Sequence, residues 1–250
     1  MKYSLCILLF ILLWNCNISK PETPSAENII NESIKVSGGQ LLDASILHFD
    51  FRNMHYTAIR NNGNFELMRE FVDSSSSHIS NVKDVLSNSG FQRFVDGIAI
   101  QVADSMVVKY SASVNSAHYF SVLPFGLNNK AVNKELRNTT VINDEEYHTI
   151  KVTFEQDGGG EDFEDVFMYW VHTETDKINY LAYSYNESDG KGVRFRQAYN
   201  ERYIEGVRFV DYNNYKPEES FINLTELPQL FELGKLKLLS KIELENLTFN

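Results

Sequence analysis

The most conspicuous group of potentially reactive side chains is an acidic, glycine-rich loop at residues 157–165. It contains five acidic residues and three glycines, and Asp157, Glu161 and Asp162 are its candidate metal ligands. Hard cations such as Ca²⁺ bind clustered carboxylates on flexible loops, so a calcium site is one hypothesis. The spacing does not match an EF-hand loop. We therefore favour a solvated turn and expect no bound metal.

A second group surrounds His118, in a stretch that we expect to be helical. His118 could act as a general base or donate a hydrogen bond to a ligand, with Asn115 and Tyr119 close by. A histidine in such a stretch is more often a core residue whose polar atoms are satisfied, and we favour that alternative. Ser113 and Ser116 add hydroxyl groups, but the Gly-x-Ser-x-Gly turn of a serine hydrolase is missing around them.

A third group lies on two expected strands. Arg194 and Arg196 alternate with apolar residues, so their guanidinium groups share one face of a strand. Two such groups could hold the carboxylate or phosphate head of a ligand. The favoured alternative is pairing with acids on neighbouring strands, such as Asp211 or Glu164. Together with Tyr183 and Tyr185, these arginines are nevertheless the best candidates for polar recognition at the rim of a pocket.

Other catalytic and cofactor motifs are missing from the sequence. We find no histidine-rich metal pattern, P-loop or dinucleotide fingerprint, and we therefore expect no cofactor. The regular strand–helix alternation of a barrel aldolase is absent as well. A catalytic role is left open but is not the favoured one.

The elements that must position these residues are mostly strands. Residues 139–216 form an antiparallel series in which β-branched and aromatic residues alternate and short polar turns separate the runs. The middle runs are apolar on both faces, so something must cover each side of the sheet. The expected strands are 147–155, 165–172, 177–185, 193–199 and 207–216.

The rest of the chain adds helices and further strands. Helices are expected at 26–36, 104–123, 128–136 and 224–233. Strands are expected at 65–72 and 237–249, and 44–60 forms one long strand or a bent pair. Residues 78–103 fit short helix or strand equally well. The helix at 104–123 is apolar enough to be buried. The fold class predicted is mainly β (α+β): a curved antiparallel sheet or half-open barrel wrapped around one or two helices, in a single domain over 28–250.

The N-terminus has the pattern of a targeting segment. A charged start at Lys2 precedes an apolar run that is about half the ~20 residues needed to span a bilayer. Cys16 follows that run and resembles the acylated cysteine of a bacterial lipobox, although Trp14 and Asn15 stand where small residues are usual. We therefore expect a lipoprotein signal peptide at 1–16 and a polar tether at 17–27. An ordinary secretion signal and a membrane-anchoring helix are the alternatives.

Charge and cysteine content limit the binding partners and the disulfide bonds that the protein can have. There are 34 acidic and 23 basic residues, a net charge of −11, and we see no basic cluster. Nucleic-acid binding is therefore not expected, since phosphate neutralisation needs patches of Lys and Arg. Both cysteines, Cys6 and Cys16, fall in the targeting segment, so the fold must stand without a disulfide. The expected location is the cell envelope, lipid-anchored, with the outer membrane favoured.

Several motifs also resemble those of a known family. The chain is similar to uncharacterised Bacteroidota lipoproteins in 113–120, 123–128, the acidic loop, Tyr183-Ser-Tyr185, Val193-Arg194-Phe195-Arg196 and Phe209-Val-Asp211-Tyr212. The resemblance covers most of 30–249. It implies a half-open antiparallel barrel enclosing helices, like that of periplasmic lipoprotein carriers. One departure is Ser37, which stands before Gly38 where the family often carries histidine.

These observations leave three functional hypotheses. The first is a membrane-anchored protein that binds a lipophilic or amphipathic ligand in the hollow of the curved sheet. The second is an enzyme acting on an envelope substrate, with His118 and the acids of 157–165 near the reaction. The third is a structural lipoprotein whose interior is filled by its own side chains. The first is favoured because both faces of the middle strands are apolar.

Overall fold

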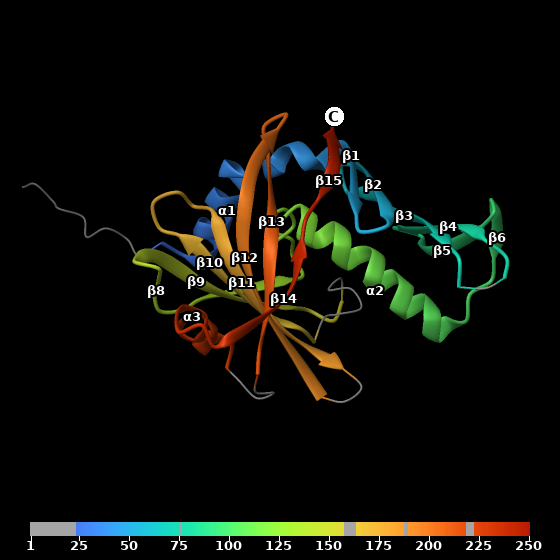
Figure 1. Ribbon diagram of the computed structural model, residues 1–250. Coiled ribbons are helices and arrows are strands. Elements are labelled where there is room, and N and C mark those ends of the chain that lie inside the picture. Colours follow the sequence, from blue (N-terminus) through green and yellow to red (C-terminus); the bar gives the residue numbers. More distant parts are fainter. Residues whose placement is uncertain (1–23, 76, 158–163, 188–189, 219–222) are drawn as a thin grey trace, which may run out of the picture.

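The computed structural model describes residues 24–75, 77–157, 164–187, 190–218 and 223–250 (Figure 1). Within them the chain forms two antiparallel sheets and three α-helices. The mainly β, antiparallel fold class predicted from the sequence is confirmed. The strands are divided between two sheets that meet near the middle of the molecule (Figure 1).

Sheet B contains the predicted meander. Its strand order is β14-β13-β12-β11-β10-β9-β7, and β8 also pairs with β9. The five predicted strands of the meander, β9 to β13, are rich in β-branched and aromatic residues and are separated by polar turn residues. The bounds are β7 (Val132–Leu136), β8 (Thr140–Ile142), β9 (Glu145–Phe154), β10 (Val166–His172), β11 (Ile178–Glu187), β12 (Gly190–Ile204), β13 (Val207–Pro217) and β14 (Leu236–Ile242).

Both faces of sheet B are covered, which explains the apolar character of its middle strands. On one face, Tyr169 packs in a cluster with Ile30 of α1 (Ala26–Val36). On the other face, Trp170 packs with Leu227 of α3 (Leu227–Glu232), a helix that follows a 3-10 turn at Leu224–Glu226. Consecutive residues of β10 thus belong to different cores.

Sheet A contains the first six strands of the chain and the last one. Its order is β15-β1-β2-β3-β4-β5-β6, with hairpins between successive strands from β1 to β6. Asn62 and Gly63 join β2 to β3, and both have positive φ, as the predicted Asn-Gly turn requires. The bounds are β1 (Ala44–Phe51), β2 (Met54–Asn61), β3 (Asn64–Asp73), β4 (Ser80–Ser87), β5 (Gly90–Val95), β6 (Ile98–Ile100) and β15 (Glu245–Phe249).

Helix α2 (Asp104–Ser121) runs from the outer end of sheet A to the junction of the two sheets (Figure 1). The predicted helix is confirmed, but it is buried along one stripe only. Ser111, Val114, His118 and Ser121 form that stripe at helical spacing, and Val108 is exposed. Three of these four side chains are polar: His118 donates to the Met68 carbonyl of β3, and Ser121 donates to the His118 carbonyl of the helix itself.

Two predicted elements near the sheet edges are wrong. Residues 128–136 were expected to be helical, but Val132–Leu136 form edge strand β7. Their exposure alternates with a period of two, the pattern of a half-covered strand. Residues 237–249 were expected to form one strand and instead form β14 of sheet B and β15 of sheet A.

The break between β14 and β15 has a local cause. Asp211 Oδ1 accepts a hydrogen bond from the Leu244 amide (3.0 Å), and Arg202 Nη2 donates to the Leu244 carbonyl (2.8 Å). These side chains satisfy the backbone at a point where the strand ladder ends. The chain can therefore leave sheet B and pair with β1.

The paired glycines after α1 also have a packing reason. Gly38 has a φ of 69°, a left-handed conformation that glycine adopts without strain. A Cβ at this position would collide with the carbonyl oxygen of Gly206, in the turn between β12 and β13. The predicted end of helix 26–36 is confirmed, and it places α1 against sheet B.

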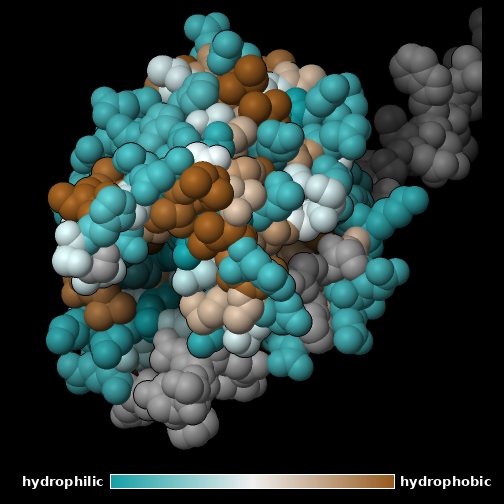
Figure 2. Space-filling model, turned by 90° about the vertical axis from the view of Figure 1, so that its right-hand side faces the viewer, coloured by the Kyte–Doolittle hydropathy of each residue, from teal (hydrophilic) through white to brown (hydrophobic). Residues whose placement is uncertain are grey.

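The outer surface is mixed. Figure 2 looks at the sheet A end and shows apolar residues gathered among hydrophilic ones. No helix in the described part of the chain is long and apolar enough to span a membrane. Large apolar residues are exposed on β3 to β6, their connecting segments and α2; they include Val72, Ile79, Ile98, Ile100 and Val108.

Candidate functional site

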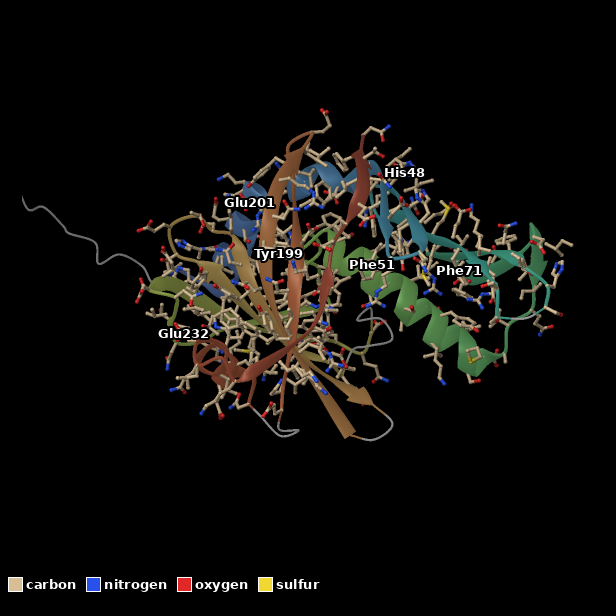
Figure 3. The ribbon with its side chains drawn as sticks, in the orientation of Figure 1. His48, Phe51, Phe71, Tyr199, Glu201 and Glu232 are labelled. Atoms are coloured by element: carbon tan, nitrogen blue, oxygen red, sulfur yellow. The ribbon has the colours of Figure 1, made fainter. Side chains whose placement is uncertain are left out.

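A cavity of about 290 Å³ lies where the two sheets and α2 meet. Phe51, at the end of β1, lies beside this junction, and Phe71 lies farther out on sheet A (Figure 3). Both sheets and the helix contribute to the wall, so the cavity exists only in the assembled fold. Its apolar lining residues are Phe49, Phe51, Met54, Tyr56, Ala117, Phe120, Val210, Tyr212, Ile242 and Leu244.

Three arginines and three serines supply the polar part of the wall. The arginines are Arg52, Arg69 and Arg196, and the serines Ser113, Ser116 and Ser121 come from α2. Among the described residues that line the cavity there is no Asp or Glu. Apolar walls with a few polar groups are typical of small-molecule sites.

Arg69, on β3, is fully engaged by the protein. Its Nε and Nη2 donate to Asp84 Oδ2 at 3.2 and 2.5 Å, and its Nη1 donates to Ser113 Oγ at 2.7 Å. Asp84 is completely buried and also accepts from Arg93 Nε at 2.6 Å. This ion-pair cluster connects β3, β4 and β5 with α2 and leaves Arg69 no free nitrogen.

Arg196, on β12, is in a different state. Its Nη2 donates to the hydroxyl of Tyr183 at 2.7 Å, and its guanidinium carbon lies 3.7 Å from the centre of the Phe120 ring. The residue is only 7% exposed, yet Nε and Nη1 have no hydrogen-bond partner among the described residues. Because Arg196 lines the cavity, it places a positive charge at the wall without an acid partner among the described residues.

The structure brings together some of the predicted arginine and tyrosine candidates. Tyr183 and Arg196 are in contact at the cavity. Arg194 lies 5.2 Å from the Tyr185 ring and donates to the Val193 carbonyl, and neither Arg194 nor Tyr185 lines the cavity. The two arginines thus lie at different places along one strand face.

The acid proposed as a partner for the arginines has other contacts. Asp211 accepts from Arg202 Nη2 at 3.0 Å and from Asn200 Nδ2 at 2.6 Å. Its second role, at the Leu244 amide, holds the link between the sheets. Asp211 therefore belongs to the framework of the fold.

His118 lies behind the cavity wall. It is 1% exposed, its ring packs edge-on against Phe49 and Tyr56, and Nε2 lies 2.9 Å from the Met68 carbonyl, to which it donates. Burial lowers the pKa of His118 to about 3, with the positive charges of Arg60 and Arg69 acting in the same direction. The imidazole is neutral at physiological pH and supports the aromatic wall.

The two other candidates on α2, Asn115 and Tyr119, lie one helical turn apart but differ in burial. Asn115 is exposed. Tyr119 shares a short hydrogen bond of 2.5 Å with the hydroxyl of Tyr169, and burial raises its pKa. Neither residue lines the cavity.

The metal and lipidation candidates fall mostly outside the described residues. Glu161, Asp162 and Cys16 are among them, and Asp157 is exposed at the end of the described stretch. Within the described part of the chain, no three His, Cys, Asp or Glu side chains are placed to hold a metal ion.

The sequence analysis did not identify Arg69, Asp84 or the aromatic wall of β1 and β2. One signal was available. Asp84 alternates with Val82 and Leu86 on a strand, so its carboxylate occupies a position where an apolar residue is expected. A charge in such a register indicates a buried ion pair.

A more open groove of about 590 Å³ lies at the outer end of sheet A. It is formed by β3, β4 and the region of β5. Unlike the cavity between the sheets, it has residues of one sheet only. Its lining residues are Glu70, Phe71, Val72, Asn81, Val82, Lys83, Phe94 and Gly97.

The fold and cavity define an antiparallel two-sheet protein with an apolar site at the junction of its sheets. The chain belongs to a family of unknown function, DUF6503, whose model matches residues 2–244. No curated protein matches the chain.

Three solved structures resemble this one along most of their length. A LolA superfamily protein from Nitrosomonas europaea is 10% identical, with a TM-score of 0.46 over 91% of this chain and 92% of that chain. A DUF1329 family protein from Desulfovibrio piger is 8% identical, with a TM-score of 0.42 over 91% and 94%. A domain described as an outer membrane lipoprotein-sorting protein, from Vibrio parahaemolyticus, is 8% identical, with a TM-score of 0.39 over 88% and 93%.

Proposed function

We propose that this protein binds a lipophilic or amphipathic small molecule in the cavity between its two sheets. The observation that carries the proposal is the cavity of about 290 Å³, whose wall is mostly aromatic and aliphatic. Its volume is close to the lower end of the range found for ligand sites, roughly 300–1,000 Å³. Covering the apolar surface of such a hollow with a ligand removes that surface from water, which favours binding.

The two other hypotheses have less support. A general base must reach its substrate, and His118 is buried behind the wall with Nε2 engaged by the Met68 carbonyl. A purely structural interior would be filled by its own side chains at close-packed density, whereas this interior keeps a hollow between its sheets. Ligand binding therefore has the stronger support, without catalysis.

We further propose that the protein is held at the cell envelope by acyl chains on Cys16. The support is the apolar segment that precedes this cysteine and the polar stretch 17–27 that follows it. Expression of Cys16→Ser should move the protein from the membrane fraction to the soluble fraction. Cys6→Ser is the matched control, and it should stay in the membrane fraction. Mass spectrometry of the mature N-terminal peptide should show an acylated Cys16.

The binding proposal is tested by filling the cavity. Native protein extracted without added lipid should carry co-purifying lipid that mass spectrometry detects. Ala117→Phe places a ring in the cavity and should remove that lipid, whereas Asn115→Phe, on the exposed side of the same helix, should not. Equal lipid content in both variants, at equal helix content by circular dichroism, would contradict the proposal.

A further inference from the structure

Three arginines are buried among the described residues, and they differ in their hydrogen-bond and ion-pair partners. Arg69 pairs with Asp84, and Arg208 pairs with Glu201 at 2.6 Å and also donates to the Ile178 carbonyl. Arg196 has a tyrosine hydroxyl as its single polar contact in the described part of the chain. A buried cation normally has an acid partner because removing a charge from water is costly.

The surroundings of Arg196 hold its guanidinium in one place. The Arg196 guanidinium carbon lies 3.7 Å from the centre of the Phe120 ring, and 5.1 and 6.0 Å from the centres of the Tyr183 and Tyr212 rings. Cation–π contacts and the hydrogen bond to Tyr183 orient the group while leaving Nε and Nη1 unused. The donors are thus fixed before any ligand binds, which reduces the entropic cost of binding.

The charges around the cavity favour an anion. Arg69 and Arg93 share the single carboxylate of Asp84, so this cluster keeps a net positive charge, and Arg52 adds a further positive charge at an exposed position of the wall. No carboxylate of the described residues lines the cavity to compete for Arg196. An anionic group entering here would meet a cation in a largely apolar setting, where the attraction is stronger than in water.

We propose that the ligand is a single-chain amphiphile with an oxyanion head, a carboxylate or a phosphate, that pairs with the guanidinium group of Arg196 at the cavity wall. The inference rests on the proposed function and names its ligand class. The head would form charge-assisted hydrogen bonds with the guanidinium. The tail would cover the aromatic wall formed by Phe49, Phe51 and Tyr56.

The test uses the full mature chain, stripped of lipid, and four probes whose tails differ by at most one methylene group: decanoate, decyl phosphate, decanol and decylamine. Isothermal titration should show that at least one anion binds roughly tenfold or more tightly than decanol, and that decylamine binds most weakly. The two anions distinguish a carboxylate head from a phosphate head. Acetate and inorganic phosphate, which lack the tail, should compete only weakly.

Two variants locate the effect. Arg196→Met should reduce the affinity for both anions to that for decanol and leave the decanol affinity unchanged. Arg194→Met, on the same strand but away from the cavity, should bind all four probes like the wild type. If Arg196→Met does not fold, Arg196→Gln gives the same comparison with a polar side chain.

The outcomes separate this inference from the proposed function. If decanol binds the wild type as tightly as the anions, or if Arg196→Met keeps the anion preference, the oxyanion inference is wrong while lipophile binding stands. If no probe binds and no lipid co-purifies, the proposed function itself is wrong. Anion preference that disappears with Arg196 alone supports both.

Discussion

Arg69 and Arg196 line the same cavity from different sheets, and the comparison separates a structural arginine from an available one. Both are more than nine-tenths buried. On the sheet A side, every nitrogen of Arg69 has an acceptor, and the acid that pairs with it is itself completely buried. On the sheet B side, Arg196 rests on aromatic rings and keeps two donors unused. Burial alone therefore does not reveal a function, but the list of partners does.

The largest loss of stability is expected when the acid of the Arg69–Asp84–Arg93 cluster is replaced. Asp84→Asn would leave Arg69 and Arg93 facing a neutral group in a buried cluster. Breaking a buried ion pair in this way costs about 3–5 kcal/mol, so urea unfolding should show a loss of that size. The exposed Asp43→Asn is the control and should change stability by less than about 0.5 kcal/mol. A loss as small as the control's would show that the cluster does not hold α2 and sheet A together.

The same substitution at both arginines should give opposite results. Arg69→Met removes one partner of buried Asp84 and should cost on the order of 3 kcal/mol. Arg196→Met removes a charge that has no acid partner among the described residues, so stability should stay the same or rise. Thermal unfolding of the ligand-free proteins measures both. Equal losses at the two positions would mean that Arg196 is structural too.

Lowering the pH should destabilise the folded protein through His118, which packs behind the aromatic wall of the cavity. Its pKa is about 3 in the folded protein, against an ordinary value of 6.5 in the unfolded chain. Between these values the unfolded state binds the proton and the folded state does not, so stability falls as pH decreases from 6.5 towards 3. The slope for one proton is about 1.4 kcal/mol per pH unit, which gives a loss of roughly 2 kcal/mol from pH 7 to pH 5.

The variant His118→Gln isolates this contribution from that of the carboxylates. Its amide can still donate to the Met68 carbonyl, but it does not titrate. Urea unfolding of both proteins at several pH values should give curves that diverge below pH 6.5, with the variant losing less stability. Parallel curves would show that His118 is not the group responsible.

Local patterns predicted much of sheet B and the first hairpins of sheet A. Alternation, turn residues and the double apolar faces of 165–172 and 177–185 depend on neighbours in the sequence, and the structure has these strands and covers both faces. The strand β7 was missed because a short edge strand has few apolar residues to reveal its period of two. The exchange of β15 into sheet A depends on Asp211, about 33 residues earlier, and no local pattern contains it.

The site was predictable to a smaller extent for the same reason. Arg196 and Tyr183 were selected because they share a strand face with other polar residues, which is local information. The pairing of Arg69 with Asp84, and its contact with Ser113 of α2, joins positions 15 and 44 residues apart. The distinction between an engaged and a free arginine therefore becomes visible only when the partners are placed in space.

The smallest expected effects come from the hydroxyl that each arginine contacts. Ser113→Ala removes the acceptor of Arg69 Nη1. Because Ser113 is exposed, a water molecule can replace its hydroxyl group. We therefore expect a stability loss of about 1 kcal/mol or less and no change in probe affinity.

Tyr183→Phe removes the acceptor that orients Arg196 and leaves the ring in place. Because the guanidinium would then be less fixed, decanoate affinity should fall several-fold, by about 1 kcal/mol, with decanol affinity unchanged. If Ser113→Ala alters anion binding as much as Tyr183→Phe does, then both walls take part in recognition, and the division between a structural and an available arginine fails.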